Sequence, residues 1–226
     1  MRHILDRPIW SALETRHAAL SEGGTLAKRY VPSISAFAAT GDDTAESLEA
    51  LRQLATRGEK LLLVQASDIV LPQGLTIVST ASLVQMTAEQ HLPEISEPRI
   101  QPLREADAEE MLALATLTKP GPFSLRALSF GDFWGVKING RLVAMAGERM
   151  KQPGFTELSG VCTDPDYRGK GLGRLLSRFV AGHIFARGDQ PYLHAYATNP
   201  VAIAFYETIG FKLRSPMNAA MVAAAA

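Results

Sequence analysis

The chain has 226 residues, of which 46% are hydrophobic and 20% charged, a composition typical of globular proteins that excludes disordered and fibrous classes. The 23 basic side chains balance the 23 acidic ones, so no overall field attracts nucleic acid or an anionic membrane. Division between residues 97 and 98 leaves 8 basic and 12 acidic groups in the first part and 15 and 11 in the second, which is mildly basic.

The first 97 residues predict a small α/β domain. Leu48, Leu51 and Leu54 recur at helical spacing, which predicts a helix over residues 45–56. Residues 60–65 predict a buried strand, and residues 75–86 predict one or two more. This half contains no constellation with recognisable chemistry. Three roles stay open for it: a lid, a substrate wall or a packing partner.

A linker is predicted at residues 91–100, where two prolines and several charged residues separate two apolar regions. We place the domain boundary between Glu97 and Pro98, which gives domains 1–97 and 98–226. The apolar run at residues 219–226 predicts either a closing strand or an alanine-rich tail.

Beyond the linker the order of elements is clearer. The expected elements are strands at 100–103, 133–138, 142–150 and 155–163, helices at 106–118 and 172–184, a strand at 192–197, a helix at 200–208 and a strand from residue 211. Asn139-Gly140 lies between two of these strands and is a strong hairpin signal. The pattern predicts an α+β fold, with a mixed sheet and helices packed on it.

Cys162 is the single cysteine of the chain. One cysteine excludes an intrachain disulfide and disfavours a thiolate metal site, which fits a reducing compartment. The five histidines show no metal-ligand spacing, so no metal is expected. The N-terminus has no signal-like apolar run, and no stretch reaches the roughly 18–20 apolar residues of a spanning helix. We therefore expect a soluble cytoplasmic protein with no membrane or nucleic-acid partner.

A glycine-rich turn connects the strand at 155–163 to the helix at 172–184. It carries Arg168, Gly169, Lys170, Gly171 and Gly173, with Arg174 just beyond. Glycines leave backbone amides unblocked, and a helix N-terminus adds positive potential, so the turn favours an anion. The basic side chains add charge of the same sign. The sequence therefore predicts a phosphate site here.

Three phosphate-binding patterns compete for this turn. The nucleotide-triphosphate loop requires Gly-x-x-x-x-Gly-Lys-Ser/Thr, which the chain lacks. A dinucleotide fingerprint starting at Gly169 needs glycine or alanine where Arg174 stands, and its distal acidic residue has to be Asp189, which lies in a turn before the next strand. The pattern that fits is Arg168-x-x-Gly171-x-Gly173.

In these residues the chain resembles the GNAT superfamily of N-acetyltransferases, whose acetyl-CoA motif is Gln/Arg-x-x-Gly-x-Gly/Ala after a strand. A second family pattern, Asn-x-x-Ala-x-x-x-Tyr-x-x-x-Gly-Phe, is matched from Asn199 to Phe211. The resemblance covers residues 99–214, and the two motifs together are specific. It implies a mixed, mostly antiparallel sheet flanked by helices. Some members of the superfamily carry a degenerate acetyltransferase-like half upstream, which is one reading of residues 1–97.

The resemblance also implies roles for individual residues. Val161, Cys162 and Thr163 would bind the pantetheine arm of acetyl-CoA through the backbone, like an added strand. The pyrophosphate would be bound by Arg168, Gly169, Lys170, Gly171, Leu172, Gly173 and Arg174. Asn199 would contact the cofactor arm, and Tyr206 would protonate the departing CoA thiolate. Acetyl-CoA is then the donor and an amine the acceptor. The identity of this amine and the oligomeric state of the protein stay undetermined.

Transfer of an acyl group to an amine also needs a base and an oxyanion site. Glu157 lies four residues before Val161, so we expect it on the same strand face and near the amine. Glu148 in the neighbouring strand is the other candidate. For both, a structural ion pair with Arg149 or another basic residue is an equal alternative. The oxyanion is expected to meet a strand NH near Val161.

Several candidates have plainer explanations. Tyr206 would otherwise be an amphipathic-helix tyrosine with its hydroxyl at the surface. Cys162 should point away from Val161, which favours a buried core thiol over a nucleophile. A satisfied or cleft-lining role is favoured for His194.

Phe123, after the first helix of this half, and Trp134 are acceptor-pocket candidates, although a rigid surface loop and a core aromatic are favoured. The sequence thus predicts an acyl-CoA-dependent N-acetyltransferase that works by direct attack in a ternary complex. A non-catalytic acyl-CoA-binding or regulatory module is the alternative.

Overall fold

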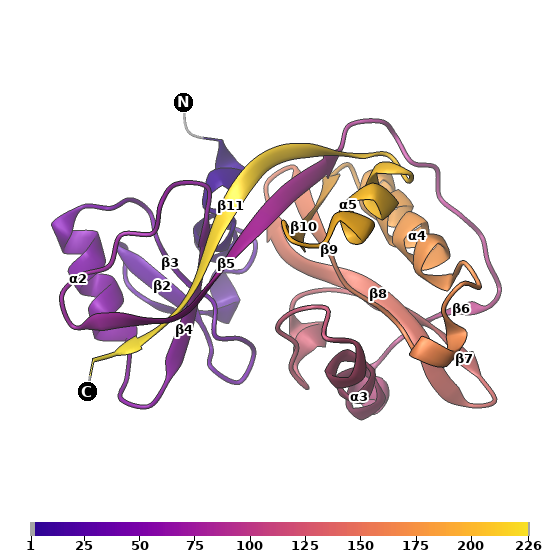
Figure 1. The fold of residues 1–226 in the computed structure, drawn as a ribbon, viewed down its shortest axis with the longest axis horizontal. Helices are drawn as coiled ribbons and strands as arrows, with labels where there is room; N and C mark the ends of the chain where they lie inside the picture. Colours follow the sequence, from indigo (N-terminus) through magenta and orange to yellow (C-terminus); the bar gives the residue numbers. More distant parts are fainter. Residues whose placement is uncertain (1–2, 226) are drawn as a thin grey trace. The chain divides into compact units, whose positions relative to one another are not determined.

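The computed structural model describes residues 3–225, which form two compact units (Figure 1). The first unit contains the described residues up to Gln85, Ala195–Asn199 and the chain from Arg214 onward. The second contains Met86–His194 and Pro200–Leu213. The units interleave along the chain, whereas the predicted domains meet at a single boundary between Glu97 and Pro98. Domains with that boundary stay a prediction.

The first unit combines short helices with two groups of strands. Its elements up to residue 65 are η1 Ile4–Asp6, α1 Pro8–Glu14, η2 Ala18–Leu20, β1 Ser21–Gly23, β2 Ala27–Tyr30, β3 Ala38–Thr40, α2 Ala45–Leu54 and β4 Lys60–Gln65. β1, β2 and β3 form an antiparallel sheet in that order. The predicted helix and strand correspond to α2 and β4. The elements before α2 were not predicted, because they are too short to show a periodicity.

The C-terminal run is a closing strand. β11 Phe211–Ala224 pairs antiparallel with β4, from Asn218 opposite Gln65 to Ala223 opposite Lys60. β5 Leu75–Ala88 is one continuous strand, and the order in this unit is β4-β11-β5. Leu61 and Leu63 of β4 share a buried cluster with Ala220 and Val222 of β11. Their burial explains why an alanine-rich segment is ordered as a strand.

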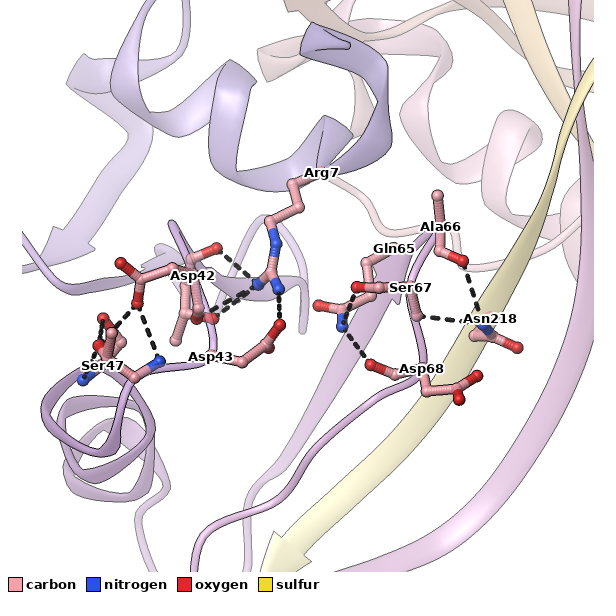
Figure 2. Close-up of polar contacts among 11 residues, drawn as sticks. Arg7, Asp42, Asp43, Ser47, Gln65, Ala66, Ser67, Asp68 and Asn218 are labelled. Carbon is pink, nitrogen blue, oxygen red and sulfur yellow. Dashed lines mark hydrogen bonds and ion pairs between the residues drawn. The ribbon is translucent and has the colours of Figure 1, made fainter. Parts of the chain in front are cut away.

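A polar network links the start of the first unit to β3 and α2 (Figure 2). Arg7 donates to the Thr40 carbonyl at 3.1 Å and to the Thr40 hydroxyl at 3.0 Å, and it pairs with Asp43. Asp42 accepts from Thr44, whose hydroxyl caps α2 by accepting from the Ser47 amide. The adjoining cavity has a volume of about 10 Å³, too small for an organic ligand. The network therefore holds the unit together, and the structure gives it no further chemistry.

The second unit is built on a mixed sheet in the order β5-β10-β9-β8-β7-β6. The strands are β6 Ile100–Pro102, β7 Phe133–Ile138, β8 Arg141–Gln152, β9 Phe155–Thr163 and β10 Gln190–Tyr196. β6 to β9 pair antiparallel, and β10 runs parallel to β9. Asn139 and Gly140 have φ values of 52° and 78°, the left-handed pair that a tight hairpin requires. The predicted α+β class and mixed, mostly antiparallel sheet are confirmed.

Helices cover both faces of this sheet (Figure 1). They are α3 Ala108–Thr118, α4 Leu172–Ala186 and α5 Pro200–Glu207; single turns η3 Glu105–Asp107, η4 Ala127–Ser129 and η5 Pro165–Tyr167 lie between elements. Phe133 belongs to the core cluster that contains Met111 and Leu114 of α3, whereas the next residue, Trp134, stacks edge-on against Phe179 of α4. Because neighbouring strand residues point to opposite faces, α3 and α4 lie on opposite sides of the sheet.

Candidate functional site

The turn after β9 is anchored by Asp164. Its backbone amide donates to the Val143 carbonyl at 2.8 Å, and its carboxylate accepts from the Asp166 amide at 3.0 Å. The carboxylate also pairs with Arg141. The Asp166 amide and, less strongly, Arg141 lower the pKa of Asp164, so it stays ionised near neutral pH. The chain consequently leaves β9 in one defined direction.

Two glycines then place the chain in the left-handed region. Gly169 and Gly171 have φ values of 75° and 76°, and a Cβ at either position would find no atom within 4 Å. Glycine is thus required by conformation, and the side from which a Cβ would project is open. Gly173 is different, because a Cβ there would lie 3.5 Å from the Thr163 hydroxyl, an ordinary contact. This fits a pattern that accepts glycine or alanine at that position.

The backbone amides of the turn indicate an anion site. α4 is 15 residues long, and its first backbone hydrogen bond runs from the Leu175 amide to the Gly171 carbonyl at 2.9 Å. Within residues 3–225 the amides of residues 169–174 have no backbone partner. Gly171, the N-cap, has no side chain to satisfy them. Six open amides at the positive end of a helix dipole suit a pyrophosphate.

The basic side chains of the turn differ in their contacts. The Lys170 ammonium lies 4.4 Å from the centre of the Tyr167 ring, a cation–π contact, and Arg168 is exposed. Arg174 donates to the Thr208 carbonyl at 3.2 Å and to the Thr208 hydroxyl at 2.6 Å. Arg174 therefore links the start of α4 to the end of α5, and its predicted contact with the cofactor stays a prediction.

β9 contains a bulge. In the β8–β9 ladder Ser159 pairs with Gly147, and Cys162 pairs with Met145. Gly160 and Val161 thus oppose the single residue Ala146. Gly160 has a φ of 61°, and a Cβ there would lie 2.7 Å from the Phe133 ring. The bulge therefore depends on glycine for its conformation and for its closeness to Phe133.

The bulge changes which residues of β9 share a face with Glu157. Paired residues share a face, so Ser159 and Cys162 lie on the α3 face, and Glu157 lies there with Ser159. Glu157 thus shares a face with Cys162 and not with Val161. The inference from four-residue spacing was wrong because the extra residue in β9 shifts the alternation by one. Cys162 is buried in the core, as predicted.

β9 and β10 separate after a short parallel ladder. Their pairs run from Gln190 opposite Phe155 to Tyr192 opposite Glu157. β9 continues to Thr163 and stays paired with β8 on its other side. In the described residues no strand pairs with the β10-side edge of β9 beyond Glu157. That edge, which includes the predicted Val161–Thr163 stretch, is open to an added strand-like ligand.

Glu157 is the centre of a buried charged cluster. Its carboxylate accepts from Nε of Arg149 at 2.8 Å and from Nη2 of Arg149 at 2.7 Å, and its Oε1 lies 2.8 Å from Nδ1 of His194. Its side chain is 0% exposed, and that of His194 is 5% exposed. Burial raises the pKa of Glu157, but the Arg149 charge and the hydrogen bonds from Arg149 and His194 outweigh it and lower the pKa to about 2. The ion pair with Arg149, one of the two alternatives for Glu157, is present, and direct base catalysis by Glu157 stays a prediction.

Glu148 lies on the other face of the sheet. It follows Gly147, which pairs with Phe133 on the α3 face, so its side chain points to the α4 side. Its carboxylate is fully buried and pairs with Lys151 at 2.7 Å and with Arg187, the C-cap of α4. The structure thus brings Glu157 and Glu148 to opposite faces, although the sequence offered them as equivalents. A catalytic role for Glu148 stays a prediction.

Tyr206 lies on α5 and is half-buried. Burial and, to a smaller extent, the neighbouring Cys162 raise the pKa of Tyr206 to about 12. Burial also raises the pKa of Cys162 to about 11, against a hydrogen bond with Thr118. The hydroxyl therefore keeps its proton at neutral pH and lies near β9. Asn199 precedes α5 and belongs to the first unit, and its predicted contact with acetyl-CoA stays a prediction.

The two proposed acceptor-pocket aromatics do not meet. Phe123 packs edge-on against Phe133 with ring centres 5.6 Å apart, on the α3 face. Trp134 lies on the α4 face, 5.7 Å from Phe179 and 5.3 Å from His183. Trp134 is thus the core aromatic that the plainer interpretation expected. Phe133, and not Trp134, is the aromatic residue that lies beside Phe123. Strand alternation could have shown this, because adjacent strand residues face opposite sides of the sheet.

Within residues 3–225, no three His, Cys, Asp or Glu side chains gather as a metal site would require. None of the helices described here combines the length and apolarity needed to cross a bilayer.

Comparison with known proteins places the chain in a family. A solved structure from Novosphingobium aromaticivorans, described as a GNAT-family acetyltransferase, is 39% identical, covers 100% of both chains and has a TM-score of 0.94. The chain belongs to the GNAT family. Within it, the family described as FR47-like protein matches residues 135–219, which include β8, β9, α4 and α5.

Curated relatives match the GNAT chain over a shorter segment. N-alpha-acetyltransferase RimI of Mycobacterium tuberculosis is 38% identical over 81 residues, which are 34% of this chain and 50% of that protein. The ribosomal protein bS18-alanine N-acetyltransferase of Escherichia coli is 36% identical over 74 residues, 32% of this chain and 49% of that protein. The matched segment thus spans about half the length of these relatives.

Proposed function

We propose that this GNAT chain transfers an acetyl group from acetyl-CoA to a primary amine by direct attack in a ternary complex. The observation that carries the proposal is the open backbone of the second unit: six unpaired amides at the start of α4, and an unpaired edge of β9 leading to them. One feature suits the pyrophosphate, and the other suits the amides of the pantetheine arm. Family membership supports the same donor.

Donor binding follows from the two open features. The phosphates would accept from the amides of residues 169–174, while the exposed Arg168 and Lys170 add positive charge. The pantetheine arm would pair with the backbone at Val161 and Thr163. The bulge at Gly160 turns the local backbone away from the ladder, and a strand amide near Val161 would meet the oxyanion.

The leaving group requires a proton, for which Tyr206 is suited. With its pKa raised to about 12 it is fully protonated at neutral pH. It would donate this proton to the sulfur as the carbon–sulfur bond breaks, and recover one lost by the amine nitrogen. The names of the two curated relatives support an amine acceptor. A cytoplasmic setting is supported by the single, buried free thiol.

The test is release of CoA thiol from acetyl-CoA in the presence of small amines, amino acids and peptides that begin with alanine. We expect release that depends on enzyme and on at least one amine, and thermal stabilisation by acetyl-CoA alone. The buried ion pairs of Glu157 and Glu148 give specific support to a rival function, a non-catalytic acyl-CoA-binding module. Stabilisation by acetyl-CoA without release for any amine would favour that rival.

A further inference from the structure

A charged cluster lies where β9 and β10 separate. The parallel ladder ends at the Tyr192–Glu157 pair, and His194 is two residues farther along β10, on the same face as Tyr192. Nδ1 of His194 lies 2.8 Å from Oε1 of Glu157. His194 thus lies just beyond the last β9–β10 pair, on the strand that faces the unpaired edge of β9.

We propose that His194 is the proton acceptor for the amine in the acetyl transfer, and that Glu157 is the residue that positions it. This inference rests on the proposed function and goes beyond it by reassigning the base. Glu157, the sequence-based candidate, becomes a support for the histidine.

Glu157 is poorly suited to accept the proton itself. Both of its oxygens bond Arg149, and one also contacts His194. A proton on either oxygen would have to displace one of these charge-assisted bonds in a site with no solvent exposure. The pKa of about 2 expresses the same cost. A carboxylate held in this way is a fixed negative charge.

His194 has the complementary chemistry. An imidazole that donates its Nδ1 proton to a carboxylate carries its lone pair on Nε2. The anchored carboxylate holds the ring in this tautomer and stabilises the imidazolium that forms on proton uptake. The groups that face it include Glu157 from β9, Arg149 of β8 through Glu157, and Tyr192 of β10, whose ring centre lies 5.7 Å away. The Tyr192 hydroxyl accepts from Gln152 at 2.9 Å.

The proton balance is simple. Nε2 of His194 takes one proton from the ammonium, directly or through water, and later releases it to solvent. The neutral amine forms a bond to the thioester carbon, and the carbon–sulfur bond breaks. The sulfur gains a proton from Tyr206, and the second proton of the nitrogen passes to Tyr206, which restores its hydroxyl. The products are the amide, CoA thiol and one proton.

The decisive variant is His194→Asn. The Asn amide can stand where Nδ1 stands and donate to Glu157, but it has no basic nitrogen. We expect kcat/KM for amine acetylation to fall on the order of 10²-fold or more. The acidic limb of the pH–rate profile should vanish, added imidazole should restore part of the rate, and acetyl-CoA affinity should not change. The control is His91→Asn, an exposed histidine outside the cluster, which should behave as wild type.

Glu157→Gln tests the positioning role. Removal of the negative charge disfavours the imidazolium, so the acidic limb should move to lower pH while kcat falls. A merely structural role would lower kcat in parallel at every pH and leave the limb in place, which would overturn the positioning assignment. His194→Gln serves if His194→Asn does not fold, with the same expectations for kcat/KM and imidazole rescue.

The outcomes separate the two proposals. If the wild type releases CoA with an amine and the folded His194 variants match it across the pH range, this inference fails alone. If the wild type binds acetyl-CoA but releases none with any amine, the proposed function fails and takes this inference with it.

Discussion

Arg149 and Glu157 form a bidentate ion pair across β8 and β9, and the carboxylate is wholly excluded from solvent. The pair lies where a register shift in β8 sets two residues, Arg149 and Met150, opposite Glu157. The Met150 amide lies 3.3 Å from the same carboxylate. The irregular strand thus brings a guanidinium and an amide to one buried acid.

Replacement of Arg149 by Met should leave this acid without its main cation. Breaking a buried pair by removing one partner costs about 3–5 kcal/mol of unfolding free energy. Urea unfolding of both proteins at neutral pH measures the loss. The matched control is Arg99→Met, which removes a bidentate but exposed partner of Glu97 and should change stability little. Equal losses in the two variants would contradict the assigned burial.

The same Arg149→Met substitution should weaken a pH dependence. In the wild type the pKa of Glu157 is lowered from 4.5 to about 2, so its contribution to stability is complete above 4.5 and is lost as the pH falls toward 2. Without Arg149 the main cause of this lowering is gone, so the pKa of Glu157 should rise and less stability should be lost as the pH falls. Unfolding free energies of both proteins over a pH series would show the difference. Parallel curves would argue against it.

Tyr206→Phe should lower kcat by roughly 10²-fold and leave the affinity for acetyl-CoA unchanged, because the hydroxyl acts on the leaving sulfur. Since burial raises the pKa of Tyr206 to about 12, no loss of rate from its ionisation should appear at mildly alkaline pH. Steady-state kinetics over pH and calorimetric binding test both points. Tyr30→Phe, in the first unit, is the control. Wild-type turnover by Tyr206→Phe at every pH would remove Tyr206 from the mechanism.

Gly171→Ala should weaken acetyl-CoA binding. A Cβ would project into the open space beside the unpaired amides, and a loss of about 1.4 kcal/mol of contacts raises Kd about tenfold. The backbone strain at a φ of 76° costs a further roughly 1–2 kcal/mol of stability. Gly154→Ala is the matched control: its φ is 78°, its Cβ also meets no atom, and it lies at the other end of β9. It should lose stability but not affinity, so equal Kd values for the two variants would exclude a phosphate site at the turn.

Gly160→Ala should destabilise the second unit by about 2–4 kcal/mol, from left-handed strain and from overpacking against Phe133. Phe133→Leu should relieve the steric part. The double variant should therefore lose less unfolding free energy than the two single variants together. Strict additivity in this double-mutant cycle would show that the bulge does not depend on the approach to Phe133.

Local sequence was enough to predict much of the second unit. β7 and β9 agree with their predicted spans, and α4 begins at Leu172 as expected. The turn from Arg168 to Gly173 was found because its chemistry is local: glycines, basic residues and a following helix lie within a few positions. The same holds for the Asn139-Gly140 hairpin. Such features depend on backbone preferences that neighbouring residues settle between themselves.

Register and long-range pairing depended on the tertiary structure. One extra residue in β9 moved Glu157 to the face of Cys162, and alternation along a single strand cannot show an insertion relative to its neighbour. The partnership of Glu157 with His194 arises from two strands whose ladder stops at a particular pair. β11 joins β4 because distant apolar residues share one buried cluster. The sequence thus determined the glycine-rich turn that is proposed to bind the donor, and packing between distant segments decided which charged groups meet in the second unit.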